Sequence, residues 1–158
     1  YPQQKKCIKI SRDNKMKIKI IGDISAFAPD IQESIRKLEE FSKDYDELYF
    51  QIAMNYGSRD EITRGMRKLA QDVAEGSLNP QEITEDTISG YLDTADVPDP
   101  DLLIRTSGEL RLSNYLIWQL AYAEFYFTDT LWPDFDKESL KEAIRYYNGR
   151  ERRFGGVK

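Results

Sequence analysis

Segments typical of β-strands alternate with amphipathic helical segments along this chain, and this alternation is what most constrains its fold. Strand-like runs occupy Lys17–Ile21, Leu48–Met54 and Asp101–Arg105, each rich in apolar residues and bounded by turn residues. Such alternation is typical of α/β proteins with a mainly parallel sheet flanked by helices. We therefore expect an α/β fold, and the length of 158 residues predicts a single domain over residues 1–158.

Helical periodicity fills the intervals between the strands. The predicted helices are one after Pro29 with Ile31, Ile35, Leu38 and Phe41 on one face, one from a Ser58–Glu61 capping box to Gly76, a short one after Asn79-Pro80, and one from Asp136 with Leu140, Ala143, Ile144 and Tyr147 buried. Two stretches are less defined. Cys7–Ile20 fits either a hairpin or a helix end followed by one strand, and Asn114–Phe127 is expected to be helical and then extended.

Composition excludes several function classes. A net charge of −5 argues against a general binder of nucleic acid or of acidic membranes. The sequence has no histidine and one cysteine, which rules out Ser-His triads, histidine metal sites and an internal disulfide. Catalysis would therefore use carboxylates, Arg or Lys, hydroxyls or a carboxylate-held metal, and a reducing compartment such as the cytoplasm fits.

Loops that follow the strands are the expected ligand side of such a fold. The loop after the third strand carries Arg105, Arg111 and Ser113. Guanidinium groups match phosphate oxygens, and a hydroxyl fills a remaining acceptor, so this loop predicts an anion cradle. The alternative is that both arginines pair with Glu109 or with surface carboxylates.

Other residues allow more than one reading. Glu124, within an aromatic segment, could hold Mg²⁺, pair with an arginine or point outward. Asn55 and Arg59 stand where a strand meets a helix amino terminus, a place that favours anions but also ordinary capping. The basic tail with Arg153 and Gly155 is either solvated or a phosphate nest.

One long run, from Asp101 to Phe135, closely resembles the signature of cis-prenyltransferases, above all the bacterial undecaprenyl diphosphate synthases. Shorter matches lie at Ile21–Asp23, Ala53–Ile62 and Arg152–Gly156, and together they resemble the carboxyl-terminal part of that family. The resemblance implies that the fold is incomplete at its amino terminus. No nucleotide P-loop, dinucleotide fingerprint or DDxxD-type motif competes with this reading.

The family adds isopentenyl diphosphate repeatedly to an allylic diphosphate, farnesyl diphosphate, and makes the lipid carrier of cell-wall peptidoglycan. The resemblance implies that Arg105, Arg111 and Ser113 grip isopentenyl diphosphate and that Glu124 helps to hold Mg²⁺, often across a homodimer. It implies that Asn55 and Arg59 line the active site. Arg153 and Gly155 match a tail that reaches the neighbouring subunit's diphosphate.

The resemblance also has a gap, because the D-G-N-G-R-W motif for the allylic diphosphate does not occur in this sequence. We therefore expect the chain alone to be inactive, as a piece of a longer enzyme. The alternatives are a non-catalytic partner subunit of a heteromeric enzyme and an unrelated phosphate-binding regulatory domain. We further expect a homodimer joined through Asn114–Phe127, no nucleic-acid partner, and membrane contact only through the lipid product.

Overall fold

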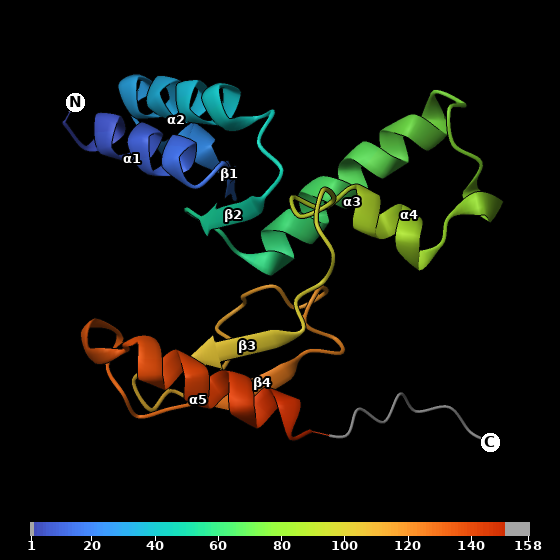
Figure 1. The fold of residues 1–158 in the computed structure, drawn as a ribbon. Helices are drawn as coiled ribbons and strands as arrows, with labels where there is room; N and C mark the ends of the chain where they lie inside the picture. The colour runs from blue at the N-terminus through green and yellow to red at the C-terminus, as the bar shows by residue number, and fades with distance from the viewer. Residues whose placement is uncertain (1, 151–158) are drawn as a thin grey trace, which may run out of the picture. The chain divides into compact units, whose positions relative to one another are not determined.

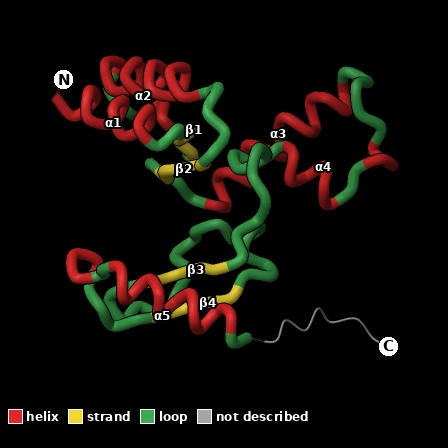
Figure 2. The backbone as a smooth tube through the Cα atoms, viewed as in Figure 1, coloured by secondary structure: helices red, strands yellow, loops and turns green. Residues whose placement is uncertain are grey.

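The chain divides into two compact units, Tyr1–Pro98 and Asp99–Lys158. The computed structural model describes residues 2–150 of it. In this described part each unit has its own two-stranded parallel sheet (Figures 1 and 2). The predicted α/β class with parallel strands and flanking helices is confirmed. The prediction of a single domain over residues 1–158 is not tested by this division.

The sheet of unit 1 pairs β1 (Met16–Ile21) with β2 (Leu48–Ala53). Parallel pairing needs a crossover connection, and α2 (Pro29–Ser42) provides it. The first helix, α1 (Pro2–Asp13), lies beside α2, and both pack on β1 (Figure 1). A helix followed by one strand is therefore confirmed for Cys7–Ile20, and the hairpin alternative is wrong.

Two buried serines join the helices of unit 1 to β1. Ser11 Oγ donates to Met16 O at 2.8 Å, and Ile18 N donates to Ser42 Oγ at 3.0 Å. Both serine side chains are buried, so these bonds replace the water that burial removes. Ile18 lies in the buried core as well. The helix layer is thus attached to the sheet by hydrogen bonds as well as by apolar contact.

The remainder of unit 1 is α3 (Ser58–Ala74), η2 (Pro80–Glu82) and α4 (Glu85–Gly90). The chain after α4 crosses α3 closely at Gly65, where a Cβ atom would lie 2.9 Å from Tyr91 O. Any larger side chain at this position would push the two segments apart.

The predicted capping box of α3 is wrong. Gly57 is the N-cap and makes no side-chain cap hydrogen bond, while Ser58 is the first helical residue and is buried. Glu61 is only 1% exposed, and its carboxylate accepts hydrogen bonds from outside the helix. Tertiary partners therefore replace the local cap that the sequence spacing indicated.

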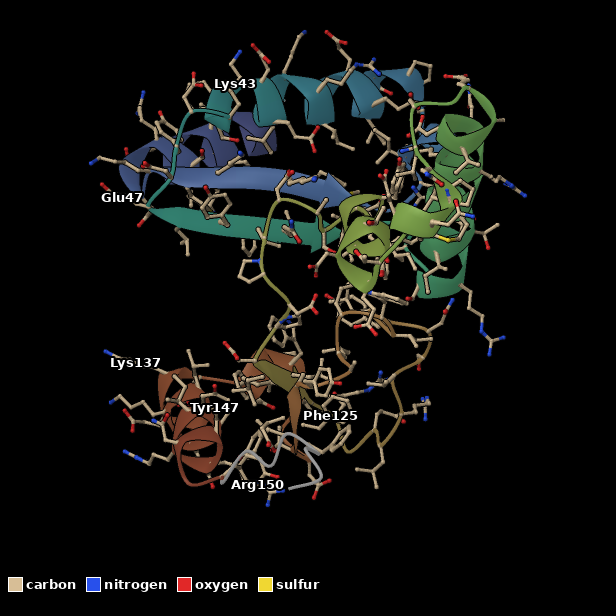
Figure 3. The ribbon with its side chains drawn as sticks, turned by 90° about the vertical axis from the view of Figure 1, so that its right-hand side faces the viewer. Lys43, Glu47, Phe125, Lys137, Tyr147 and Arg150 are labelled. Atoms are coloured by element: carbon tan, nitrogen blue, oxygen red, sulfur yellow. The ribbon has the colours of Figure 1, made fainter. Side chains whose placement is uncertain are left out.

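Unit 2 pairs β3 (Leu102–Arg105) with β4 (Glu124–Phe127) and continues through η3 (Trp132–Asp134) to α5 (Lys137–Asn148). The helix packs on β4, where the rings of Tyr126 and Tyr146 lie 5.3 Å apart. The labelled side chains of Phe125, Tyr147 and Arg150 mark this strand and the end of the helix in Figure 3.

Two expectations for unit 2 need correction. Residues 114–123 form a series of turns rather than a helix, although the extended part is confirmed as β4. On α5, Ala143 is buried as predicted, but Leu140 is 42% and Ile144 43% exposed. Helical spacing identifies an apolar face, but the extent to which it is covered depends on the neighbours available. Within residues 2–150, no helix is long and apolar enough to cross a membrane.

Candidate functional site

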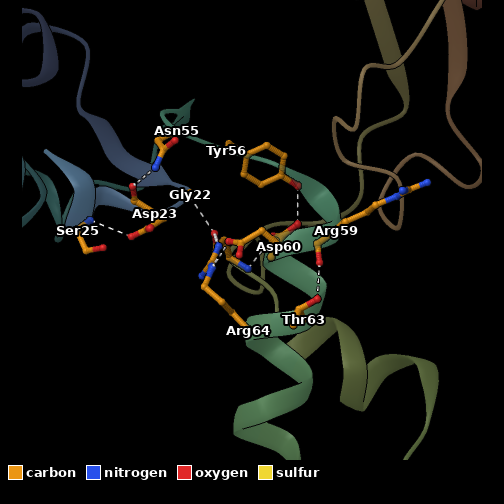
Figure 4. Close-up of polar contacts among 11 residues, drawn as sticks. Gly22, Asp23, Ser25, Asn55, Tyr56, Arg59, Asp60, Thr63 and Arg64 are labelled. Carbon is orange, nitrogen blue, oxygen red and sulfur yellow. Dashed lines mark hydrogen bonds and ion pairs between the residues drawn. The ribbon is translucent and has the colours of Figure 1, made fainter.

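The carboxyl ends of β1 and β2 bring two of the predicted loops together, because parallel strands end at one edge of their sheet. Asp23 N donates to Asn55 O at 3.3 Å, and Asn55 Nδ2 donates to Asp23 O at 2.9 Å (Figure 4). Asn55 has a φ of 46°, a left-handed conformation in which asparagine is enriched. The two loops are thus one hydrogen-bonded edge.

Gly22 makes this close approach feasible. Its φ of +109° is unfavourable for residues with a side chain, and a Cβ atom there would lie 2.3 Å from Met54 O. Any other residue would therefore push the loop after β1 away from the end of β2.

Arg59 follows on the first turn of α3, where its side chain is exposed. It points away from Arg64, which lies on the opposite side of the helix (Figure 4). This edge is suited to an anion, because the positive end of the helix dipole lies there. Asn55 adds an amide donor, and Arg59 adds a cationic guanidinium.

A buried carboxylate supports this edge from behind. Glu61 Oε2 accepts from Tyr56 Oη at 2.5 Å, and Glu61 Oε1 accepts from Asp93 N at 2.9 Å. An almost fully buried carboxylate is costly unless hydrogen bonds compensate it, and these two donors come from different segments. Glu61 therefore links the loop after β2 to the chain after α4.

Arg64 and Asp93 form the strongest ion pair of this network. Arg64 Nη1 and Nη2 donate to the two carboxylate oxygens of Asp93 at 3.0 and 2.7 Å, and Gly22 N donates to Asp93 Oδ2 at 2.9 Å. The hydrogen bonds to Asp93 raise the pKa of Arg64 above its usual value. Burial acts to raise the pKa of Asp93, but the bonds from Arg64 and Gly22 outweigh it and the pKa is lowered.

Sequence reasoning did not single out Glu61, Arg64 or Asp93 as site residues. Glu61 fitted a capping box, Arg64 fitted an exposed helical position, and Asp93 lies in a loop without periodicity. Their partners are distant in sequence, so no local pattern could identify the network.

Unit 2 has a cavity of about 370 Å³ at the carboxyl end of β3. Its lining combines one cation and several hydroxyls with apolar residues: Leu103, Ile104, Arg105, Thr106, Ser107, Glu109, Leu112 and Tyr115. Burial raises the pKa of the Tyr115 phenol, which therefore stays protonated over the physiological range. The volume of the cavity lies at the lower end of the range for ordinary small-ligand sites.

The turn that closes this cavity depends on a glycine. Gly108 has a φ of +68°, and its N–H donates to Thr128 O at 3.0 Å while Ser107 N donates to Thr130 O at 2.9 Å. A Cβ atom on Gly108 would lie 2.9 Å from Asp129 Oδ1. The turn is therefore fixed against the segment that follows β4.

The three predicted cradle residues take different places. Arg105 lines the cavity, and within residues 2–150 it makes no ion pair. Arg111 is exposed and forms an ion pair with Glu109, which lines the cavity. Ser113 is exposed, has a φ of 51° and does not line the cavity. Arg111 therefore makes the ion pair that the alternative described, and its part in an anion cradle stays a prediction.

Glu124 pairs with an arginine, one of the three readings considered for it. Its Oε2 atom accepts from Arg150 Nε at 3.2 Å, and the guanidinium of Arg150 also lies 5.6 Å from the centre of the Tyr146 ring. The strand register places Glu124 opposite Leu102 and Arg105 opposite Phe127. The three-residue offset puts the side chains of Glu124 and Arg105 on opposite faces of the sheet.

The described residues do not form a complete metal site. Within the described residues no group of three or more His, Cys, Asp or Glu side chains could hold an ion. Mg²⁺ commonly takes one or two carboxylates and completes its shell with substrate phosphates, so Glu124 fits as one ligand among several. Arg153 and Gly155 lie outside the described residues.

A family model described as "Putative undecaprenyl diphosphate synthase" matches residues 3–155. The isoprenyl transferase of Streptococcus pneumoniae is 52% identical over 148 residues, which are 91% of this chain and 59% of that protein. The ditrans,polycis-undecaprenyl-diphosphate synthase of Vibrio vulnificus, named as specific for (2E,6E)-farnesyl diphosphate, is 47% identical over 94% of this chain and 59% of its own length.

Solved structures show the same similarity. The crystal structure of lavandulyl diphosphate synthase from Lavandula x intermedia, in complex with dimethylallyl diphosphate, superposes with a TM-score of 0.90 at 37% identity. It covers 95% of this chain and 65% of that chain. This chain therefore spans less than two thirds of the length of each of these three relatives.

Proposed function

Because this chain belongs to the undecaprenyl diphosphate synthase family of prenyltransferases, we propose that its protein condenses isopentenyl diphosphate sequentially onto farnesyl diphosphate to give a long polyprenyl diphosphate. In each step the allylic C–O bond breaks, a new C–C bond forms with isopentenyl diphosphate, a proton is lost and pyrophosphate leaves. The product would serve as the lipid carrier of peptidoglycan synthesis.

The observation that carries this proposal is the cavity at the end of β3. Arg105 is its one cationic lining residue, next to the hydroxyls of Thr106 and Ser107. A guanidinium binds two phosphate oxygens at once, and hydroxyls satisfy further acceptors. We assign this cavity to the diphosphate of isopentenyl diphosphate, with Arg105 as its main binding residue.

Arg111 would join this site by exchanging its partner. Its ion pair with Glu109 is exposed, and exposed pairs of this kind contribute only about 0–1 kcal/mol. A diphosphate carries more negative charge than one carboxylate, so its approach would draw Arg111 from Glu109. Ser113 lies two residues further along and would supply a hydroxyl to the same anion.

Asn55 and Arg59 would bind a diphosphate at the edge of unit 1. Both are donors on the loop–helix segment after β2, and the helix dipole adds to their attraction. Binding a diphosphate on a fixed loop–helix segment would restrict the orientation of the substrate, which lowers the entropic barrier to reaction. Arg153 and Gly155 would add donors from the tail.

Mg²⁺ would stabilise the charge that develops on the departing pyrophosphate. Glu124 would be its protein ligand, and Arg150 would release the carboxylate when the ion binds. Because Glu124 and Arg105 lie on opposite faces of their strand pair, we propose that Glu124 serves the site of a second copy in a homodimer. The exposed Ile117 and Tyr122 would form part of the contact surface.

Incorporation of radiolabelled isopentenyl diphosphate into long products tests the proposal. The protein expressed from its complete reading frame should need both farnesyl diphosphate and Mg²⁺, and Arg105→Ala should lower kcat/KM about 30-fold or more because a charged hydrogen-bond donor is lost. Arg36→Ala, an exposed pair with Glu33 on α2, is the matched control. Equal rates for the two variants would argue against the assigned cavity.

The 158-residue chain alone should show no turnover, since it has no D-G-N-G-R-W segment for the allylic diphosphate. The same assay on the purified chain checks this. Steady product formation by the chain would contradict the expectation of inactivity. It would leave the proposed role of Arg105 unchanged.

A further inference from the structure

We infer that Arg64 and Asp93 are a positioning pair: they hold the loop after β1 against the first turns of α3 and so set the positions of Asn55 and Arg59. This inference rests on the proposed function, because the ligand of that edge is the diphosphate proposed above. It concerns residues that do not themselves contact the substrate.

The carboxylate of Asp93 joins two elements directly. It accepts from both Nη atoms of Arg64 on α3 and from the backbone N–H of Gly22, at 3.0, 2.7 and 2.9 Å. A bidentate guanidinium–carboxylate pair fixes orientation as well as distance. The end of β1 is therefore held at a defined place relative to α3.

The backbone of the same residue makes a second connection. Asp93 N donates to Glu61 Oε1, and the other oxygen of Glu61 accepts from Tyr56, the neighbour of Asn55. Asp93 thus contacts the loop after β1 through its side chain and the loop after β2 through Glu61. Both loops then meet in the Asn55–Asp23 hydrogen bonds.

Partial burial distinguishes this pair from the surface pairs of the chain. The side chain of Asp93 is 18% and that of Arg64 28% exposed, against 57% and 51% for Arg36 and Glu33 on α2. Arg64 Nε is also held, by Asp60 at 2.8 Å. A guanidinium restrained at three nitrogens has little freedom, so its loss should release the loop.

Hydrogen exchange of the 158-residue chain tests the structural half of the inference. Arg64→Gln and Asp93→Asn should raise the exchange rate of the Gly22 amide about tenfold relative to that of the Ile18 amide. Ile18 N donates to Ser42 in the same unit and reports general loss of structure. Arg64→Lys, which keeps the charge, should lie in between, and Arg36→Gln should match the unmodified chain.

Titration with inorganic pyrophosphate, a probe of the diphosphate group alone, tests the functional half when it is followed through the backbone NMR signals of Asn55 and Arg59. Arg64→Gln and Asp93→Asn should each raise the Kd at these residues about fivefold or more, and the double variant should be no worse than either, because the two residues act as one unit. Arg36→Gln should leave this Kd unchanged.

The two experiments distinguish failure of this inference from failure of the proposed diphosphate site. An unchanged ratio of Gly22 to Ile18 exchange in Arg64→Gln overturns the inference, as does a raised ratio with an unchanged Kd, which would make the pair merely structural. If the unmodified chain shows no shift at Asn55 or Arg59, the proposed diphosphate site at this edge is itself wrong, and the positioning role is lost with it.

Discussion

Arg105 and Glu124 lie at opposite ends of one parallel strand pair, with their side chains on opposite faces. Arg105 stands opposite Phe127, and Glu124 stands opposite Leu102. The two positions are offset by three residues along the strands, which corresponds to about 10 Å in the strand direction. A single copy of this unit therefore does not bring the proposed diphosphate ligand and the proposed metal ligand to one place.

This relationship predicts complementation between inactive subunits. Arg105→Ala and Glu124→Gln should each abolish most of the activity, but a dimer that contains one of each keeps one intact site. A random mixture should recover about a quarter of the unmodified rate, since half of the dimers are mixed and each has one working site. The measurement is product formation after the two variants are refolded together. A rate no higher than the sum of the separate variants would place both residues in one subunit's site.

Arg111→Ala should affect one substrate more than the other. Arg111 is paired with Glu109, which lines the cavity proposed for isopentenyl diphosphate. Loss of the arginine should raise the KM for isopentenyl diphosphate about tenfold, because one charged hydrogen bond to the substrate is lost. The KM for farnesyl diphosphate should change little. Steady-state kinetics with each substrate varied in turn provides the measurement, with Arg36→Ala as control, and equal effects would count against this role.

Gly108→Ala should destabilise the cavity turn. The φ of +68° is strained for alanine, and the new Cβ would approach Asp129 Oδ1 to 2.9 Å. We expect the free energy of unfolding to fall by about 1–2 kcal/mol. Gly90→Ala is the matched control, because its added Cβ would meet nothing within 4 Å. Urea unfolding of both variants decides, and equal midpoints would show that the turn tolerates a side chain.

Asp93 should contribute to the loss of folding stability at low pH. Its folded pKa lies below the ordinary 3.8, so the pair with Arg64 stabilises fully above that pH and loses this contribution as the pH falls through the folded pKa. Asp93→Asn should therefore lower stability at pH 7 and show a flatter decline below pH 4. Asp96→Asn is a suitable comparison, because Asp96 pairs with Lys19 but is 52% exposed and should matter less. Urea midpoints between pH 7 and pH 2 provide the measurement, and parallel curves for Asp93→Asn and the unmodified chain would be the contrary result.

Local patterns predicted the helices and strands of this fold well where a segment contains a clear apolar periodicity or a turn residue at its end. β1 was expected from the run at Lys17–Ile21, and α3 from the spacing that ends at Gly76, whose φ of +74° confirms the stop. The predictions were wrong where packing against distant segments determines the conformation or the burial of a residue. Residues 114–123 have helix-like apolar spacing but form turns, and Ile144 has a core-like position but is 43% exposed.

The candidate site divides in the same way. By itself the sequence determined the family and the chemical character of Arg105, Arg111, Ser113 and Glu124, because a contiguous motif preserves residue type and spacing. Only the tertiary structure decided what these side chains face: Arg105 the cavity, Arg111 a neighbouring carboxylate, and Glu124 the arginine at the end of α5.

The Arg64–Asp93 pair shows the physical reason most clearly. Gly22 and Asp93 are 71 positions apart, yet their hydrogen bond is 2.9 Å long. Such a contact arises from the parallel pairing of β1 with β2 and from the close crossing at Gly65, not from any local preference. Secondary structure and motif chemistry follow from short-range rules that the sequence states directly, whereas the partners of buried charges follow from how distant segments pack.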